Sequence, residues 1–488
     1  MNTIAQAATP LRQIAELPHP PMWPILGNAG QINKTTVHQD VERWARSLGK
    51  IFRMRFLKRD ILVIADHALL AEVMRNRPDG WQRNPQSRLV SREMGLPPGV
   101  FSAEGDAWRT QRRIVMASFA PGHIRQYFPQ MTKVTARLQS RWQKAADAAT
   151  VLPLQPELMR YTVDTIAGLA LGEDINTLEA GDEVIQQHLD KVLPAVFRRV
   201  LSSLPYWRWF KTRADRELDH SVVVINREIA RFVAQARQQL AADASLREKP
   251  RNLLQAMLVA ADAPGESQSP GSFDDTAVAG NVLTMLLAGE DTTANTVAWL
   301  IYLLHRRPES LQRLTAEILQ TLGSAAGNPQ AFTPELMDSM PYLDACINEA
   351  MRLKPVAPFI SLQALHDTQI ADVQVPKGTV LWGVLRHDSV SEPYFQRPDA
   401  FEPERWIADE SSGAHSSAKR VAMPFGAGPR VCPGRYLALL EMKMSMSMLL
   451  SSFTIASVDT PDGGEAREGM YFTMSPQGLT MRLARRSP

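Results

Sequence analysis

The stretch that most constrains this chain runs from Phe425 to Gly434 and reads FGAGPRVCPG. It holds one cysteine, Cys432, among glycines and prolines, and an apolar helical pattern begins directly after it at Arg435. Glycines let the backbone approach a large flat group closely, and Pro433 suits the first turn of a helix. A helix N-terminus lowers the pKa of a nearby thiol, and the resulting thiolate is a nucleophile or a metal ligand. The alternative is a buried, unreactive cysteine in a glycine-rich turn.

The composition is that of a large globular protein without a charge bias. The chain has 488 residues, of which 44% are hydrophobic, and its 54 Lys and Arg against 51 Asp and Glu give a net charge of +3. This balance does not indicate nucleic acid as a partner. Two cysteines, Cys346 and Cys432, cannot form a disulfide framework, so we expect a reducing, cytoplasmic location. We also expect no signal peptide and no transmembrane anchor, because no apolar stretch reaches about 18 residues.

The hydrophobic periodicity predicts a mainly α fold with small β-sheets. We expect helices over 37–48, through most of 130–232, over 341–354 and from 435 to 450, with short strands at 51–56, 61–64 and within 364–384, and a final hairpin over 469–479. The region 78–106 is rich in proline and glycine, which predicts a long loop that is functional. Residues 262–272 have the composition of a linker. We expect a tail over 1–17 and a single domain over 18–488, which opens with a proline-rich arm over 18–28.

A long helix is expected from Ser272 and Asp275, a helix-start pair, to beyond Leu304. Its middle reads AGEDTT, residues 288–293, and interrupts an otherwise apolar run with acids and hydroxyls. Such residues cost helix stability or solvation, so their presence indicates function. The alternative is that Glu290 and Asp291 point to solvent while the Thr292 hydroxyl bonds back to a carbonyl.

Two further pairs share a helical face. Trp108 and Arg112 lie four residues apart, and Glu349 and Arg352 lie three apart. A Trp beside a solvated Arg, and a surface ion pair, are the plain alternatives. Cys346 precedes Glu349 by one turn and is expected in the core.

Taken together, these residues resemble the cytochrome P450 family. Phe425, Gly428, Arg430, Cys432 and Gly434 match every fixed position of its haem-binding signature. Residues 288–293 match its oxygen-binding motif. Glu349 and Arg352, with the downstream PERW at 403–406, match two more motifs, and Trp108 with Arg112 a third. The resemblance extends from Pro20 to the C-terminus.

The resemblance implies the P450 fold and a haem b whose axial ligand is the Cys432 thiolate. Trp108 and Arg112 are then expected to bond a haem propionate. Gly289 would leave room for dioxygen, while Asp291 and Thr292 would relay protons to the oxygen being reduced. The remaining residues implied are those around the haem and those of a structural ion triad: Phe425, Gly428, Arg430 and Gly434, and Glu349, Arg352 and Arg405. Many relatives carry an Arg or His that helps hold a propionate just before the Asp matched by Asp367. This chain has Ser361, Leu362 and Gln363 in that neighbourhood instead, which puts a third propionate contact in doubt, and we do not assign His366 to it.

The reaction implied is hydroxylation or epoxidation of a mostly apolar small molecule with O2. We expect a monomer that receives two electrons from a separate ferredoxin or flavodoxin and its reductase. The donor would dock near Cys432 on basic side chains, namely Arg109, Arg113, Lys419 and Arg420. Substrate-pocket candidates are Phe101, Ala288, Val356, Phe359 and Phe472. The apolar stretch 204–210 is either core, a lid or a membrane-contacting patch.

Two other functions stay open at this point. The chain could be a peroxide-using or rearranging enzyme of the same fold, although Asp291 and Thr292 count against this. It could also be a non-catalytic haem protein that senses a gas or stores a ligand.

Overall fold

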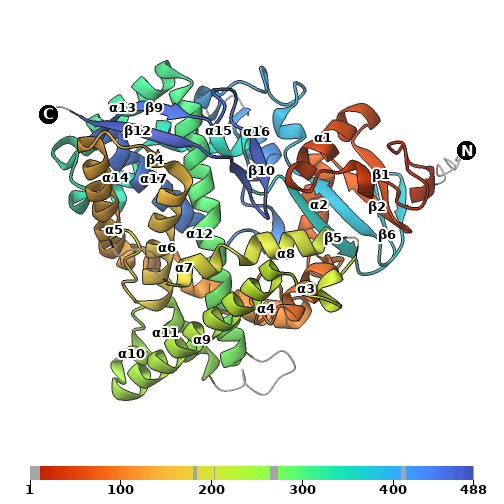
Figure 1. Cartoon of the computed structure of the whole chain (residues 1–488), viewed down its shortest axis with the longest axis horizontal. Coiled ribbons are helices and arrows are strands. Elements are labelled where there is room, and N and C mark those ends of the chain that lie inside the picture. The colour runs from red at the N-terminus through yellow and green to blue at the C-terminus, as the bar shows by residue number, and fades with distance from the viewer. Residues whose placement is uncertain (1–10, 180–183, 203, 264–272, 408–413, 487–488) are drawn as a thin grey trace, which may run out of the picture.

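The computed structural model describes residues 11–179, 184–202, 204–263, 273–407 and 414–486 and confirms a mainly α fold with small sheets (Figure 1). The described α-helices are α1 (Val37–Leu48), α2 (His67–Arg75), α3 (Pro85–Glu93), α4 (Gly105–Ser118), α5 (Pro121–Asp147), α6 (Leu154–Leu171), α7 (Val184–Leu189), α8 (Val192–Val200), α9 (Arg213–Ala242), α10 (Ser245–Glu248), α11 (Leu253–Ala261), α12 (Asp275–His305), α13 (Pro308–Leu322), α14 (Pro334–Asp338), α15 (Pro341–Leu353), α16 (Ala414–Ala422) and α17 (Arg435–Ser452).

The strands form one larger sheet and several small ones. The larger sheet has the order β1-β2-β8-β5-β3, and the small ones pair β4-β12-β9, β10-β11 and β6-β7. Their bounds are β1 (Ile51–Phe56), β2 (Arg59–Ile64), β3 (Trp81–Arg83), β4 (Leu152–Pro153), β5 (Phe359–Ala364), β6 (Thr368–Ile370), β7 (Val373–Val375), β8 (Val380–Val384), β9 (Phe453–Asp459), β10 (Glu468–Met470), β11 (Met474–Pro476) and β12 (Thr480–Arg485). The predicted hairpins at 51–64 and 469–479 are confirmed, since both pairs are antiparallel.

Helix α12 is the centre of the fold and runs through the middle of the helical part, with the larger sheet to one side of it (Figure 1). It begins at Asp275 because the Asp274 side chain accepts a hydrogen bond from the amide of Ala277, at 2.9 Å. It has 31 residues, close to the expected length, and most of them are buried, as expected for an apolar helix enclosed by others. The predicted start at Ser272 and the linker residues 264–272 lie outside the described residues.

The prediction of one long loop over 78–106 is wrong, because part of it is ordered secondary structure. Strand β3 pairs with β5, and α3 follows directly. The Asn84 side chain caps α3 by accepting a hydrogen bond from the amide of Gln86 at 3.1 Å, and Pro85 occupies the first helical position. Pro85, which contributed to the loop prediction, therefore starts a helix, where its missing N–H costs nothing.

The start of the described chain is bound to the sheet region. Arg12 pairs with Asp372 at 2.7 Å, and Leu17 is buried. The arm then pairs with the end of β1, where Gly27 bridges to Phe56. The division into a tail over 1–17 and a single domain from 18 stays a prediction.

Candidate active site

A cavity of about 1920 Å³ lies between α12, the start of α17 and the larger sheet. This exceeds the roughly 300–1,000 Å³ of a pocket for one drug-sized ligand. Its wall includes Cys432 from the glycine-rich loop and Ala288, Gly289 and Thr292 from α12. Motifs more than a hundred residues apart in the chain therefore face the same space.

Cys432 is exposed toward this cavity, whereas Cys346 is buried in α15. The Cys432 amide donates to the Phe425 carbonyl at 3.0 Å, which closes the loop ahead of α17. Gly428 has φ +71, and a Cβ there would lie 2.5 Å from the Met74 carbonyl oxygen, so this glycine lets the loop pack on the end of α2. Of the two cysteines, Cys432 is the one that a group in the cavity can reach.

The expected lowering of the Cys432 thiol pKa by the helix start is present, but it does not decide the net shift of this pKa. Burial raises the pKa, and the Gly434 amide and the charge of Arg112 lower it by less. The thiolate therefore needs a further positive charge at the sulfur. A metal ion provides this, since a coordinated thiol is deprotonated.

A cluster of arginines lies beside the cysteine loop. Arg112 donates to the Val431 carbonyl at 2.5 Å, and the Arg430 guanidinium lies 4.5 Å from the centre of the Trp108 ring. Arg430 also pairs with Glu104, whose carboxylate accepts from the amide of Arg83 at 2.8 Å. The structure thus brings Trp108, Arg112 and Arg430 together, as the family resemblance implies.

Two members of this cluster were missed from the sequence, Arg77 and Arg83. Both line the cavity, and burial with repulsion between the arginines lowers the pKa of Arg77, Arg83 and Arg430 to about 10. Buried Nε and Nη2 atoms of Arg77 and Nε of Arg430 have no hydrogen-bond acceptor among the described residues. Strand pairing brings Arg83 to the site, because Arg83 lies opposite Leu362 of β5.

These residues fit haem b. The cluster has more positive charge than the single carboxylate of Glu104 can balance, and its unpaired N–H groups are suited to two carboxylates. The cysteine faces the same cavity, and a thiolate is a suitable axial ligand for haem iron. Cys432 would hold the iron, while Arg77, Arg83, Arg112, Trp108 and Arg430 would surround the propionates.

The middle of α12 presents small and hydroxylated residues to the cavity. The Thr292 hydroxyl donates to the Ala288 carbonyl at 2.8 Å, as in the alternative we considered. Gly289 lies against α6, where an added Cβ would come within 2.8 Å of Ile166 Cγ1. The glycine is therefore required for the packing of α6 on α12, and its role in leaving room for dioxygen stays a prediction.

The two acids of this motif do not point to solvent, which excludes that part of the alternative. Glu290 is only 3% exposed, and burial and the nearby Asp190 raise its pKa well above the ordinary value. Asp291 accepts hydrogen bonds from Thr473 and from Asn295, the latter at 2.7 Å. Burial raises the pKa of Asp291, and these hydrogen bonds offset the rise in part. Thr473, in the turn between β10 and β11, was not predicted from the sequence.

The Glu349 carboxylate is the centre of a buried polar network. It accepts two hydrogen bonds from Arg352, both at 2.8 Å, and one from Arg405 at 3.0 Å. The indole of Trp406 donates to it at 2.8 Å. Glu349 and Arg352 have fully buried side chains, so this is not a surface pair.

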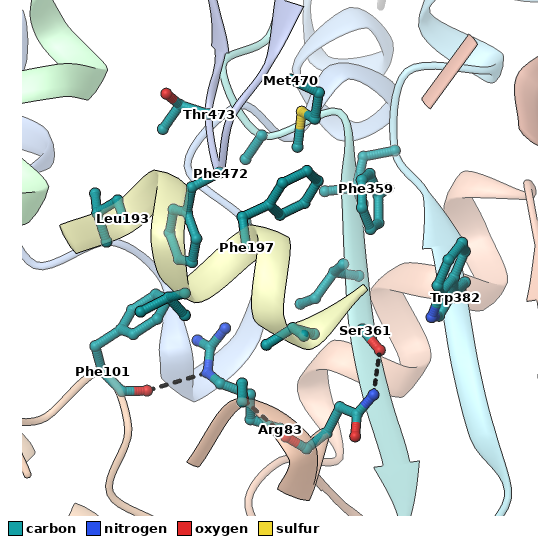
Figure 2. A pocket seen from close by; sticks show the side chains of 18 of the residues that line it. Arg83, Phe101, Leu193, Phe197, Phe359, Ser361, Trp382, Met470, Phe472 and Thr473 are labelled. Atoms are coloured by element: carbon teal, nitrogen blue, oxygen red, sulfur yellow. Dashed lines mark hydrogen bonds between the residues drawn. The ribbon is translucent and has the colours of Figure 1, made fainter. Parts of the chain in front are cut away.

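The wall away from the cysteine is mostly apolar and aromatic. The five substrate-pocket candidates all line the cavity: Phe101, Ala288, Val356, Phe359 and Phe472. Figure 2 shows Phe101, Phe197, Phe359 and Phe472 around one space. The Phe101 and Phe472 ring centroids are 5.8 Å apart, and those of Phe197 and Phe359 are 6.5 Å apart.

The apolar stretch 204–210 is buried in part and exposed in part, and a role as a lid or membrane-contacting patch stays a prediction. Trp207 is buried and donates to Glu93 of α3 at 2.9 Å, whereas Leu204, Trp209 and Phe210 are exposed. Among the described helices, none has both the length and the apolar content that crossing a membrane requires. The expected cytoplasmic location stays a prediction.

Comparison with known proteins gives one family. A model described as "Cytochrome P450" matches residues 17–481. The "self-sufficient cytochrome P450 monooxygenase CYP505AG1" of Oidiodendron maius is 28% identical over 91% of this chain, which spans 40% of the length of that relative. "Cytochrome P450 monooxygenase sphH" of Aspergillus fumigatus is 26% identical over 97% of this chain and 88% of its own, and "cytochrome P450 27C1" of Danio rerio is 27% identical over 86% and 77%.

Proposed function

Because this chain belongs to the cytochrome P450 family, whose members hold haem through a cysteine thiolate, we propose that it is a monooxygenase acting on a mostly apolar small molecule. One oxygen atom of O2 enters the substrate as a hydroxyl or an epoxide, and the other leaves as water. The observation that supports this most is the single cavity lined by Cys432, the Ala288–Thr292 segment and an aromatic wall.

The bound haem supplies oxygen activation, with the cysteine thiolate favouring cleavage of the O–O bond. The residues of this chain supply the rest. Arg77, Arg112 and Arg430 balance the charge of the propionates, and the aromatic wall excludes water and orients the substrate. The Thr292 hydroxyl lies on the cavity side of α12 and passes protons from Asp291, which is held by Thr473 and Asn295.

The first test is the ligand of the iron. The reduced protein, exposed to carbon monoxide, should absorb at the wavelength typical of thiolate-bound haem. Cys432→His should move the band to that of histidine-ligated globins, and Cys346→Ser should leave it unchanged. A globin-like band in the wild type, or no haem uptake, would contradict the proposal.

The rival functions differ in what they consume. A monooxygenase uses O2 and an electron donor in proportion to product. Turnover with peroxide alone indicates the peroxide-using or rearranging enzyme, and haem binding without substrate-dependent O2 consumption indicates a sensor. The burial of Asp291 in a hydrogen-bonded position favours the O2-using enzyme.

We further propose that the chain acts as a monomer and that the electrons come from a ferredoxin or flavodoxin docking over the Cys432 side. Arg109 and Arg113 are exposed on α4, and Lys419 and Arg420 on α16. Arg109 is already paired with Asp79 and Asp106, so Lys419 is the better test. Lys419→Glu should slow reduction by an acidic ferredoxin at low salt, with a smaller effect at high salt. A fused reductase, as the names of some relatives indicate, would instead make reduction independent of added ferredoxin.

A further inference from the structure

The cavity continues from the haem region to the surface near the N-terminal arm. We define the cavity mouth as Trp23, Ile25, Lys34, Leu57, Lys58 and Arg59 on one side, with Leu201, Pro205 and Arg208 on the other. On the first side, the N-terminal arm is hydrogen-bonded to the β1–β2 hairpin, because the amide of Leu57 donates to the Leu26 carbonyl at 3.2 Å. The second side is held to α3 by the ion pair of Arg208 with Glu93.

The charged side chains that line the cavity are almost all cationic. Among the described residues, its lining contains nine Lys and Arg side chains and one acid, the buried Glu441. Four of the nine form the cluster beside Cys432, which the propionates would balance. The other five lie at or near the mouth, where none of the described carboxylates lines the cavity.

Among the side chains that the structure describes, three of the mouth cations have no counter-charge. Arg55 is held by Asp60 at 2.8 Å and Arg208 by Glu93. In contrast, Lys34, Lys58 and Arg59 form no ion pair or hydrogen bond with a side chain in the part of the chain that the structure describes. Lys58 and Arg59 stand at the tip of the β1–β2 hairpin, where Phe56 pairs with Arg59. These cations attract an anion that occupies the mouth.

The path inward from the mouth is apolar. Phe56 packs against Trp382 with ring centroids 5.3 Å apart, and Trp382 packs against Phe359 at 5.5 Å. Phe197 and Phe472 continue this wall toward the Phe101 end of the cavity (Figure 2). A ligand that uses both regions has an anionic end and a long apolar body. A neutral terpenoid or steroid would use only the apolar part.

We propose that the substrate is an amphipathic carboxylate, with its carboxylate at Lys34, Lys58 and Arg59 and its apolar chain along the aromatic wall toward Cys432. This inference rests on the proposed function and names its substrate class. Oxidation would then fall on the part of the chain far from the carboxylate, because the carboxylate is held at the end of the cavity away from the haem.

The cavity mouth could instead bind an anionic membrane, because large apolar side chains near it are exposed: Ile25 is 87% exposed and Trp209 70% exposed. We favour a single molecule since the cations line the cavity itself and the apolar surface continues inward from them. Binding to vesicles is therefore an outcome of the test.

The test titrates the ferric holoenzyme with straight-chain alkyl carboxylates below their aggregation concentration and follows the haem spectrum and the heat of binding. Each added methylene should tighten binding about fourfold until the cavity is filled. The carboxylate should bind about tenfold more tightly than the alcohol of equal chain length, and this preference should decrease with added salt.

A double charge reversal, Lys58→Glu with Arg59→Glu, should abolish the preference for the carboxylate and leave the affinity for the alcohol unchanged. The matched control is Lys377→Glu, an exposed lysine at the turn between β7 and β8, which should change neither. Equal affinity of carboxylate and alcohol in the wild type would overturn the proposal. So would a reversal that weakens binding only to phosphatidylserine vesicles. Neither result affects the carbon monoxide band, so a failure here is distinct from a failure of the proposed function.

Discussion

At the residue scale, the Thr292 hydroxyl donates one hydrogen bond within α12, and its oxygen can still accept a hydrogen bond from a group in the cavity. It donates to the Ala288 carbonyl at 2.8 Å, so the oxygen lone pairs are held in a defined direction. We expect Thr292→Ala to keep consuming O2, because water can supply protons, but to lose control over where they go. Product formed per O2 should fall about tenfold or more.

The measurement is product and peroxide formed per O2 consumed at saturating substrate. Thr315→Ala is the control, since Thr315 makes the same kind of back-bond, to Leu311 at 2.7 Å, on α13 outside the cavity. It should leave the ratio unchanged. A Thr292→Ala variant that stays fully coupled would show that another group delivers the protons.

Spacing along the chain predicts a shared site for residues of one loop or one helix, whereas the family resemblance was needed to join distant motifs. Cys432 and Arg430 are two residues apart in one loop, so their spacing alone indicates a shared site. Arg83 could not be found this way, because the pairing of β3 with β5 brings it to the site from a distant segment. The net pKa shift of Cys432 also depends on distant contacts: the helix terminus that lowers this pKa is visible in the sequence, whereas the enclosure of the thiol within the cavity, which raises it, is not.

At the element scale, the Glu349 network joins α15 to the PERW turn. Glu349→Gln would leave Arg352 and Arg405 buried without a full counter-charge. We expect a loss of about 3–5 kcal/mol in the free energy of unfolding, measured by urea denaturation of the holoprotein. The control is Arg313→Gln, which breaks the exposed pair of Arg313 with Glu404 and should cost about 0–1 kcal/mol. Similar costs for both variants would mean that the network is not a structural lock.

The contact of α6 with α12 predicts how a side chain at position 289 affects stability. Gly289→Ala gains about 1 kcal/mol of helix propensity but places a Cβ 2.8 Å from Ile166, an overpacking that costs about 1–3 kcal/mol. We expect a net destabilisation in the wild type. In an Ile166→Ala background, which removes Cγ1 and Cγ2 but keeps the Ile166 Cβ position at 3.0 Å, the same substitution should destabilise the protein less than it does in the wild type.

The measurement is a double-mutant cycle of urea unfolding. Gly122→Ala in the first turn of α5 is the control, because nothing lies within 4 Å of a Cβ there. It should not destabilise the protein. If Gly289→Ala is equally harmful with and without Ile166, the glycine is needed for a reason other than this packing.

Some element boundaries follow from neighbouring residues in the chain, whereas others depend on pairing with distant segments. The α15 helix begins at Pro341 and ends before Pro355, as the two prolines predict. Pro85 was misread within 78–106, because the cap from Asn84 and the pairing of β3 with β5 decide that a helix starts there. A proline alone does not distinguish the start of a helix from its end.

At the scale of the whole molecule, a buried ionic network joins segments from both ends of the chain. Arg386, after β8, donates to Glu42 of α1 at 2.8 Å and to Glu468 of β10 at 2.7 Å. Glu468 also accepts a hydrogen bond from Lys354 at 2.6 Å, and its carboxylate lies 2.8 Å from Nε2 of His38. Burial raises the pKa of Glu468, but the hydrogen bonds and the charges of Arg386 and Lys354 outweigh it and hold the pKa well below its usual range.

This network predicts how stability depends on acid. In the unfolded chain Glu468 takes up a proton near pH 4.3, while in the folded protein it stays ionised to much lower pH. The unfolded state therefore binds more protons below about pH 4.3, and the free energy of unfolding decreases by about 1.4 kcal/mol for each unit by which the pH falls further.

Glu468→Gln should be less stable than the wild type at pH 7 and should lose this one-proton slope. Urea midpoints between pH 7 and 3 measure both effects, with the exposed Glu392→Gln as the control that should follow the wild type. If Glu468→Gln keeps the full slope, the acid sensitivity of this fold comes from other carboxylates, and the link between α1 and β10 does not depend on this charge.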